Sequence, residues 1–280
     1  AVAVRKTDGE IVVKTEEYKG IVQNKKIRSL PIIRGVFSFI DSMVLGMSTL
    51  TYSASFFMDE EEEEKDEKKE SVMMGLTIAC SVVMAVAIFM ILPYFLSQLF
   101  RKFTDSTTLI TLLEGAVRLV IFFGYILLIS RMKDIQRVFM YHGAEHKCIN
   151  CIEHGMELNV ENVLKSSRLH KRCGTSFLFI VMIVSIIFFL FIRIESPIWR
   201  VVFRLLLIPV IAGVSFEFIR LAGKSENKLV ILLSKPGMML QKLTTREPDA
   251  SMAEVAIASV EAVFDWRAYL KENFGWQEKV

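Results

Sequence analysis

Long apolar stretches without charge alternate along this chain with shorter charged segments. Residues 71–100 contain no Asp, Glu, Lys or Arg, and neither do residues 173–192. Apolar runs of about 18 residues or more are candidates for crossing a membrane. We therefore predict a mainly α, polytopic membrane protein with about four transmembrane helices, in a bundle that occupies 71–222. The expected spans are 72–99, 108–130, 174–194 and 198–219.

The first fifteen residues show a different pattern. Two alternating β-branched runs, AVAVR and EIVVK, flank Thr7-Asp8-Gly9. An Asp-Gly pair in this setting is a strong signal for a β-hairpin. Because these residues are charged and alternate, we expect no secretory signal peptide in them. Residues 1–30 are thus predicted to form a hairpin followed by a basic segment.

Residues 31–57 are apolar in the main, but they include Arg34, Asp41 and seven Ser or Thr residues between Ser38 and Ser55. A charge at mid-bilayer costs roughly 2.5–3.5 kcal/mol or more. We therefore expect an interfacial or re-entrant helix, with a true span as the alternative. Residues 58–70 are acidic with interspersed Lys, which predicts a solvated loop.

The distribution of Lys and Arg orients the predicted spans. The N-terminal region, the loop 131–173 and the C-terminal region are all basic. Four spans place all three on one side, while the other side carries Arg101, Lys102 and a short connection at 195–197. Since basic loops remain in the cytoplasm, we expect both termini and the loop 131–173 to be cytoplasmic, in a bacterial cytoplasmic membrane.

The chain becomes mixed in polarity after the last span. Leu229 to Leu243 is apolar with scattered Lys, which is typical of a helix along a membrane surface. Ser251 and Glu254 make a capping box, and an apolar stripe continues to about Leu270. Residues 223–280 are therefore predicted to form cytoplasmic amphipathic helices.

Charge and cysteine content narrow the function classes. The net charge of +3 is too balanced for nucleic-acid binding through bulk electrostatics, so we expect no nucleic-acid partner. Four cysteines in 280 residues are too few for a disulfide framework. The expected partners are the lipid bilayer, other membrane proteins and a second copy of the chain.

Residues 142–173 contain all four histidines and three of the four cysteines. Within this loop, His142, Glu145 and His146 have the spacing H-x-x-E-H. On a helix the two histidines lie one turn apart on one face, where both can bind one metal ion. Glu145 borders that face, as the general base does in the inverted zincin motif. The alternative is a histidine pair that forms surface hydrogen bonds near lipid headgroups.

Further ligands are available beside this pair. His170 and Cys173, three residues apart before the third span, are the preferred ones. Cys148 and Cys151 lie on the opposite side of the same helix from His142 and His146, and Glu153 lies about 10 Å from His146 along the helix axis. These are secondary candidates, together with the remaining histidine: Cys148, Cys151, Glu153 and His154.

Charged residues also occur inside the predicted spans. Glu114 and Arg118 are four residues apart in the second span, and Arg204 and Glu217 lie in the fourth. Intramembrane charges normally face the bundle interior and pair. We expect a closed intramembrane polar network. The alternatives are a polar cleft for a headgroup, peptide or proton, and Glu217 as a further metal ligand.

Five motifs resemble one bacterial membrane family, domain of unknown function 1385. They are YHGAEHK (141–147), RLHKRCGTSF (168–177), LLEGAVRL (112–119), GVSFEFIRLAG (213–223) and LTTREPDASMAEVAIA (243–258). The family carries the label of a predicted metal-dependent enzyme. The resemblance implies a metal site of His142, Glu145, His146, His170 and Cys173, and it marks Glu114, Arg118 and Glu217 as family residues.

Two functions follow as hypotheses. The first is a membrane-associated metal-dependent hydrolase with Zn²⁺ or a similar divalent ion at its cytoplasmic face and Glu145 as the catalytic residue. The second is a non-enzymatic factor for membrane-protein assembly or partner binding, with a closed four-ligand structural site and an intramembrane polar cleft. A transporter is disfavoured because the sequence shows no inverted repeat.

Overall fold

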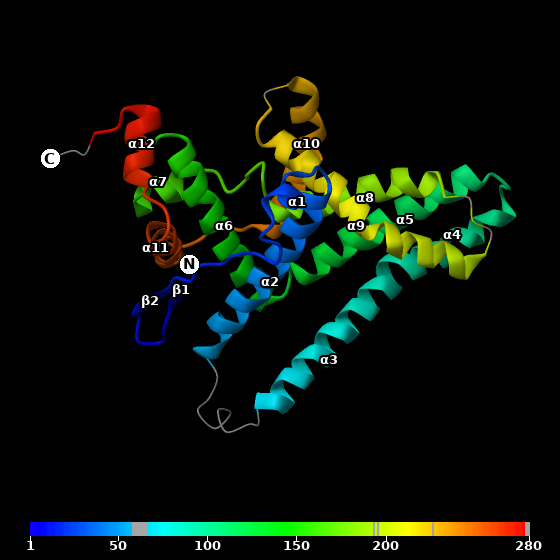
Figure 1. The fold of residues 1–280 in the computed structure, drawn as a ribbon, viewed down its shortest axis with the longest axis horizontal. Helices are drawn as coiled ribbons and strands as arrows, with labels where there is room; N and C mark the ends of the chain where they lie inside the picture. The colour runs from blue at the N-terminus through cyan, green and yellow to red at the C-terminus, as the bar shows by residue number, and fades with distance from the viewer. Residues whose placement is uncertain (58–66, 193, 195, 226, 278–280) are drawn as a thin grey trace.

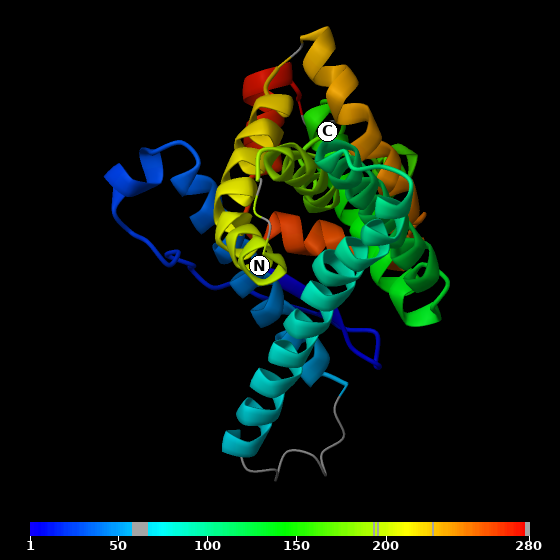
Figure 2. The same cartoon turned by 90° about the vertical axis from the view of Figure 1, so that its right-hand side faces the viewer.

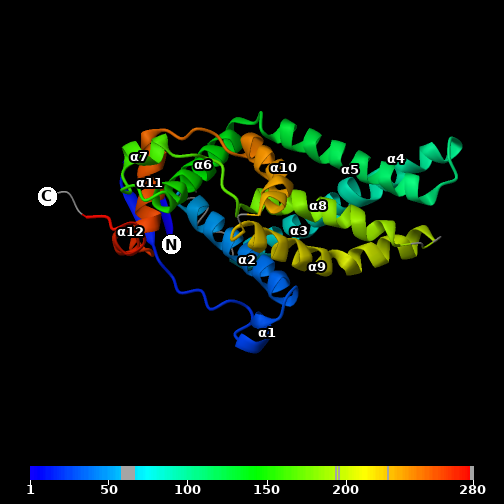
Figure 3. The same cartoon turned by 90° about the horizontal axis from the view of Figure 1, so that it is seen from above.

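The computed structural model describes residues 1–57, 67–192, 194, 196–225 and 227–277. Two parts lie end to end in it (Figures 1 and 3). We call them the bundle and the lobe. The bundle consists of α3 (Glu67–Val86), α4 (Leu92–Gln98), α5 (Thr107–Ile129), α8 (Gly174–Leu190) and α9 (Pro197–Ala222). The lobe consists of β1 (Val2–Arg5), β2 (Ile11–Lys14), α6 (Lys133–Glu153), α7 (Val160–Lys165), α11 (Ala250–Glu261) and α12 (Trp266–Phe274).

Three further helices complete the structure. These are α1 (Lys25–Ser29), α2 (Ile33–Ser55) and α10 (Lys228–Thr244). In the bundle α5, α8 and α9 run side by side, whereas α3 projects away from them (Figures 1 and 2). A π-helical turn, Ala87–Ile91, joins α3 to α4. The prediction of a mainly helical membrane protein with a small N-terminal hairpin is confirmed.

Four helices of the described residues are long and apolar enough to cross a membrane, as predicted in number. They are Ile33–Ser55, Val72–Lys102, Thr107–Ile129 and Ile198–Ala222. Three of them correspond to predicted spans. The fourth prediction, 174–194, forms a shorter apolar helix that ends at Leu190.

The bundle holds together through apolar side chains and one close approach. Phe122 and Ile126 of α5 pack with Met182 of α8 and Leu240 of α10. At Gly115 a Cβ atom would lie 2.8 Å from the side chain of Ile186 of α8, so a larger residue there would require Ile186 to shift. Apolar side chains of α5 and α9, such as Val120 and Leu206, are exposed, as expected when a bilayer and not protein covers them.

The lobe has its own core, in which Cys148 and Cys151 of α6 pack with Trp266 and Leu270 of α12. The hairpin pairs Val2 with Lys14, and its turn contains Gly9 at φ 91°, as the Asp-Gly signal predicts. An ion pair of 2.5 Å from Arg5 to Glu254 fastens the hairpin to α11. The lobe is therefore a small folded unit built from both ends of the chain and from its central helices α6 and α7.

The C-terminal helices differ from the prediction in detail. The predicted single helix to Leu270 is two helices, α11 and α12, because Asp265 caps a new helix through Ala268 N–H. Asp249 and not Ser251 caps α11. Helix α10 covers the predicted 229–243 segment. Residues 58–66 of the predicted acidic loop lie outside the described residues, and residues 67–70 belong to α3.

Candidate metal centre

Helix α6 presents His142 and His146 on one face, with ring centroids 4.4 Å apart. Each ring uses Nδ1 to bond a backbone carbonyl: His142 to Thr244 at 2.9 Å, and His146 to Arg168 at 2.7 Å. A carbonyl partner makes Nδ1 a donor, so Nε2 is the nitrogen left to bind a metal ion. The two histidines are thus oriented as metal-binding histidines usually are.

Cys173 completes the group from another element. It is the N-cap of α8, where its Sγ accepts the N–H of Thr175 at 3.4 Å. This sulfur lies 3.2 Å from Nε2 of His142. Ligand atoms of His142, His146 and Cys173 all lie within 4.8 Å of one another, close enough to bind one ion. The group joins the lobe to the first turn of a bundle helix.

The electrostatics of the group favour the ligand form of the cysteine. Burial raises the pKa of Cys173, but hydrogen bonds from His142 and His146 outweigh it and lower the pKa to about 5. Burial alone would lower the pKa of His142, but its hydrogen bond to Cys173 outweighs burial, and the pKa is raised. The sulfur is therefore a thiolate at neutral pH, which is the form that binds metals.

His170 lies beside this group but outside it. Its ring centroid is 5.8 Å from that of His146, and its Nε2 lies 3.2 Å from a carboxylate oxygen of Glu153. Arg172 pairs with the same glutamate. Burial lowers the pKa of His170, which leaves the ring neutral. The structure thus pairs two of the predicted ligands, His170 and Glu153, with each other.

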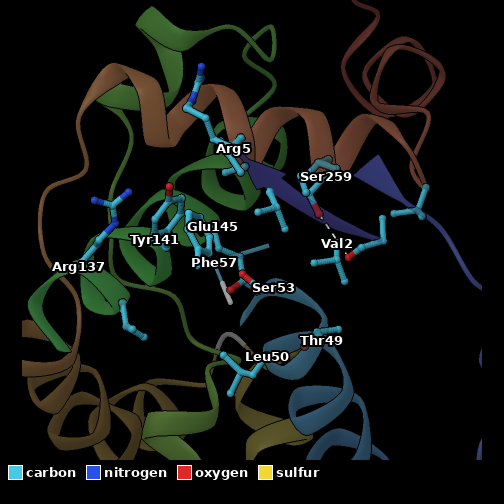
Figure 4. A pocket seen from close by; sticks show the side chains of 18 of the residues that line it. Val2, Arg5, Thr49, Leu50, Ser53, Phe57, Arg137, Tyr141, Glu145 and Ser259 are labelled. Atoms are coloured by element: carbon cyan, nitrogen blue, oxygen red, sulfur yellow. Dashed lines mark hydrogen bonds between the residues drawn. The ribbon is translucent and has the colours of Figure 1, made fainter. Parts of the chain in front are cut away.

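Glu145 occupies the adjoining face of α6, about 80° around the helix from the midpoint of the two histidines. Its carboxylate is exposed and near enough to raise the pKa of His142. It lines a cavity of about 780 Å³ between the hairpin, the end of α2, α6 and α11. Figure 4 shows Glu145 and Tyr141 of α6 facing this cavity with Val2 and Ser53. The cavity and the histidine pair therefore use neighbouring faces of one helix.

The remaining secondary candidates do not join the group. Cys148 and Cys151 are fully buried in the lobe core, on the far side of α6 as the helix geometry predicts. Burial raises the pKa of Cys148 to about 12 and that of Cys151 to about 11, so both remain thiols. His154 bonds the carbonyl of Asn150 at the end of α6. Their contacts are those of structural residues.

Several residues that support the centre were missed by the sequence reasoning. Gln241 of α10 bonds the backbone N–H and carbonyl of His170 and the hydroxyl of Ser176. A Cβ atom at Gly143 would lie 2.1 Å from the carbonyl oxygen of Arg246. A glycine inside a helix costs about 1 kcal/mol relative to alanine, so Gly143 was the available sign that a backbone packs there.

Within the bundle the predicted network forms only in part. Glu114 accepts hydrogen bonds from Arg118 at 2.9 Å and from Arg204 at 2.5 and 2.9 Å. Arg118 also bonds Ser185, and all three charged residues are at most 5% exposed. Glu217 lies elsewhere and pairs with Arg34 of α2. The buried cluster thus holds two cations and one anion and carries a net charge of +1.

The fold and this centre define a helical, membrane-associated protein with a His/Cys group between its lobe and its bundle. The chain belongs to the family described as "Protein of unknown function (DUF1385)", which it matches over residues 30–266. It is 35% identical over 282 residues to "Uncharacterized protein YqhQ" of Bacillus subtilis (strain 168), covering 97% of this chain and 88% of the relative. No solved structure matches the chain.

Proposed function

We propose that this protein is a membrane-bound metalloprotein whose centre is formed by His142, His146 and Cys173. The observation that carries the proposal is the convergence of three ligand atoms within 4.8 Å from two elements far apart in sequence. Carbonyl partners on both Nδ1 atoms support it, because they orient each ring for binding through Nε2.

The donor set favours zinc. Imidazole nitrogen and thiolate sulfur together suit Zn²⁺ and disfavour Mg²⁺ and Ca²⁺, which prefer oxygen ligands. Three protein ligands with a fourth position open are characteristic of catalytic zinc sites, whereas four protein ligands are characteristic of structural ones. His170 is engaged with Glu153, and this supports the three-ligand form.

The function that this arrangement supports best is hydrolysis next to the membrane. A zinc ion supplies Lewis-acid activation of water in such reactions. Glu145, at the boundary between the histidine face and the cavity, is the residue proposed to accept the proton. The cavity volume of about 780 Å³ falls within the range of ligand sites, about 300–1,000 Å³.

The competing function is a scaffold in membrane-protein assembly. It requires His170 to leave Glu153 and bind as a fourth ligand, which closes the site. Its supporting observation is that the centre joins α6 to the start of α8, so a metal there fastens the lobe to the bundle. The ligand count separates the two functions.

The experiment is a metal analysis of the purified full chain in detergent after equilibration with zinc. We expect one zinc per chain in the wild type and its loss in His146→Ala and Cys173→Ala. His154→Ala is the matched control and should retain zinc. Retention of zinc in His170→Ala supports the open, three-ligand site, and loss of zinc in this variant supports the closed site of the scaffold. A wild-type chain without zinc would overturn both.

The catalytic role has its own test. Glu145→Gln should retain zinc while losing hydrolysis of a peptide, lipid or phosphoester substrate, because the change removes a proton acceptor and no ligand. Loss of zinc in this variant, or unchanged hydrolysis, would contradict the role. We further propose that the lobe faces the bacterial cytoplasm, since the loop 131–173 and both terminal regions are basic.

A further inference from the structure

Helix α2 is long and apolar enough to cross a membrane, yet its contacts are those of a different kind of helix. Asp41 lies in its first half and is only 9% exposed. Its carboxylate accepts hydrogen bonds from the hydroxyl of Tyr18 at 2.9 Å and the N–H of Ile21 at 2.8 Å, and it pairs with Arg28. A polar segment, 18–28, is therefore fastened to the first half of the helix.

This segment is incompatible with the interior of a bilayer. Residues 15–24 have no regular secondary structure, and Lys19, Lys25 and Lys26 are exposed. In hydrocarbon, irregular lipid-exposed backbone leaves N–H and C=O groups unsatisfied at several kcal/mol each. Because Asp41 holds this segment against α2, the first half of α2 must lie where water reaches.

The two ends of α2 also contact the same side of the molecule. Near its start, Gly35 packs on Gly213, and Phe39 packs on Phe177 with ring centroids 5.3 Å apart. Phe177 belongs to the first turn of α8, the turn that Cys173 caps. Its other end, at Thr49, Leu50 and Ser53, lines the cavity formed by the lobe. The start of α2 thus packs on the lobe-side half of α9 and on the first turn of α8, and its other end reaches the lobe.

One face of α2 remains apolar and uncovered. Ile33, Ile40, Val44 and Met47 are each 38–44% exposed, and at about 100° per residue they fall within about 60° of one another. Asp41 lies about 100° from Ile40 around the helix. A helix with separate apolar and polar faces can lie in the membrane surface with its apolar face about 5–10 Å deep.

We propose that α2 lies along the bilayer surface on the lobe side, with the face Ile33–Ile40–Val44–Met47 inserted at the boundary between headgroups and acyl chains. The proposal rests on the membrane location given under the proposed function. The spans are then 72–102, α5, α8 and α9. An even number of crossings places the hairpin, α6 and the C-terminal helices on one side.

Depth measurements test this arrangement. Single cysteines replace Ile33, Ile40 and Met47 in a Cys80→Ser background, are labelled with a nitroxide, and are reconstituted in phosphatidylglycerol–phosphatidylcholine vesicles. Relaxation by oxygen and by a nickel chelate reports their depth. We expect similar shallow depths of about 5–10 Å. A span would separate Ile33 from Met47 by about 21 Å along the normal, and that gradient would overturn the proposal.

Val120 is exposed at the middle of α5. A label there distinguishes an error in the placement of α2 from an error in the membrane location of the whole protein. Val120 should lie near the midplane, about 15 Å deep. A shallow Val120 contradicts the membrane location itself. The Cys80→Ser parent without an added cysteine gives the background from labelling at Cys173.

A second measurement does not depend on depth. Cysteines at Lys19 and Ser55, both exposed, are probed with a membrane-impermeant maleimide in sealed membrane vesicles of one orientation. We expect both to react from the same side of the membrane. Reaction from opposite sides would show that α2 crosses the bilayer and would overturn the proposal.

Discussion

Replacing Glu114 by glutamine tests how the bundle tolerates charge. In the native cluster Glu114 receives three hydrogen bonds from Arg118 and Arg204, and these three residues carry a net charge of +1. Glutamine has a similar shape but no charge, so the variant leaves two buried guanidinium groups without an anion. The net charge of the cluster rises to +2.

The expected loss follows from burial. Removing one partner of a buried ion pair costs about 3–5 kcal/mol, because an uncompensated charge remains. Glu217 of α9 provides the matched control, since its pair with Arg34 has side chains 24–25% exposed. Because this pair is only partly buried, its loss should cost less than the loss of the buried cluster. Glu114→Gln should therefore destabilise the protein more than Glu217→Gln.

Equilibrium unfolding in mixed detergent micelles, with increasing dodecyl sulfate and helicity as the signal, gives both free energies of unfolding. The double variant Glu114→Gln/Arg204→Gln returns the net charge to +1 and should recover part of the loss. Equal losses in Glu114→Gln and Glu217→Gln, or no recovery in the double variant, would refute the reasoning.

Three further predictions concern the centre and its surroundings. Gly143→Ala should destabilise the lobe and lower zinc content, because a Cβ there meets the Arg246 carbonyl, whereas Gly124→Ala has open space and should leave both unchanged in thermal unfolding and metal analysis. In the metal-free protein, the alkylation rate of Cys173 should fall as pH falls through about 5, since hydrogen bonds from two histidines outweigh burial; a midpoint above 8 would contradict this. Gln241→Leu should lower the free energy of unfolding by about 3 kcal/mol, because three buried hydrogen bonds of about 1 kcal/mol each are lost; a loss below 1 kcal/mol would contradict that count.

The fold was predictable wherever local pattern decides structure. Charge-free runs identify α3 and α8, and the Asp-Gly turn identifies the hairpin. The prediction was less accurate where a cap competes with periodicity, as at Asp265, which divides the predicted C-terminal helix. The charged and hydroxyl residues of 31–57 predict an interfacial helix. The partners of Asp41, however, lie thirteen to twenty-three positions away, and no local pattern identifies them.

The candidate site was predictable to the extent that helix geometry governs it. The pairing of His142 with His146 and the separation of Cys148 from them both follow from 3.6 residues per turn. The choice between His170 and Cys173 does not. It depends on Glu153, which is only a secondary candidate because of its distance from His146 and which reaches His170.

Cys173 has two roles: it caps the first turn of α8, and its sulfur belongs to the candidate metal centre. The sulfur that would bind the ion also accepts the N–H of Thr175 in the first turn of α8. Metal occupancy of the centre and order at the entrance of a membrane helix would therefore be thermodynamically linked. A ligand present at about 100 times its Kd adds about 2.7 kcal/mol to the folded state. The persistence of the bundle in the membrane would then follow the concentration of available zinc on one side of it, and oxidation of this one sulfur would remove that dependence.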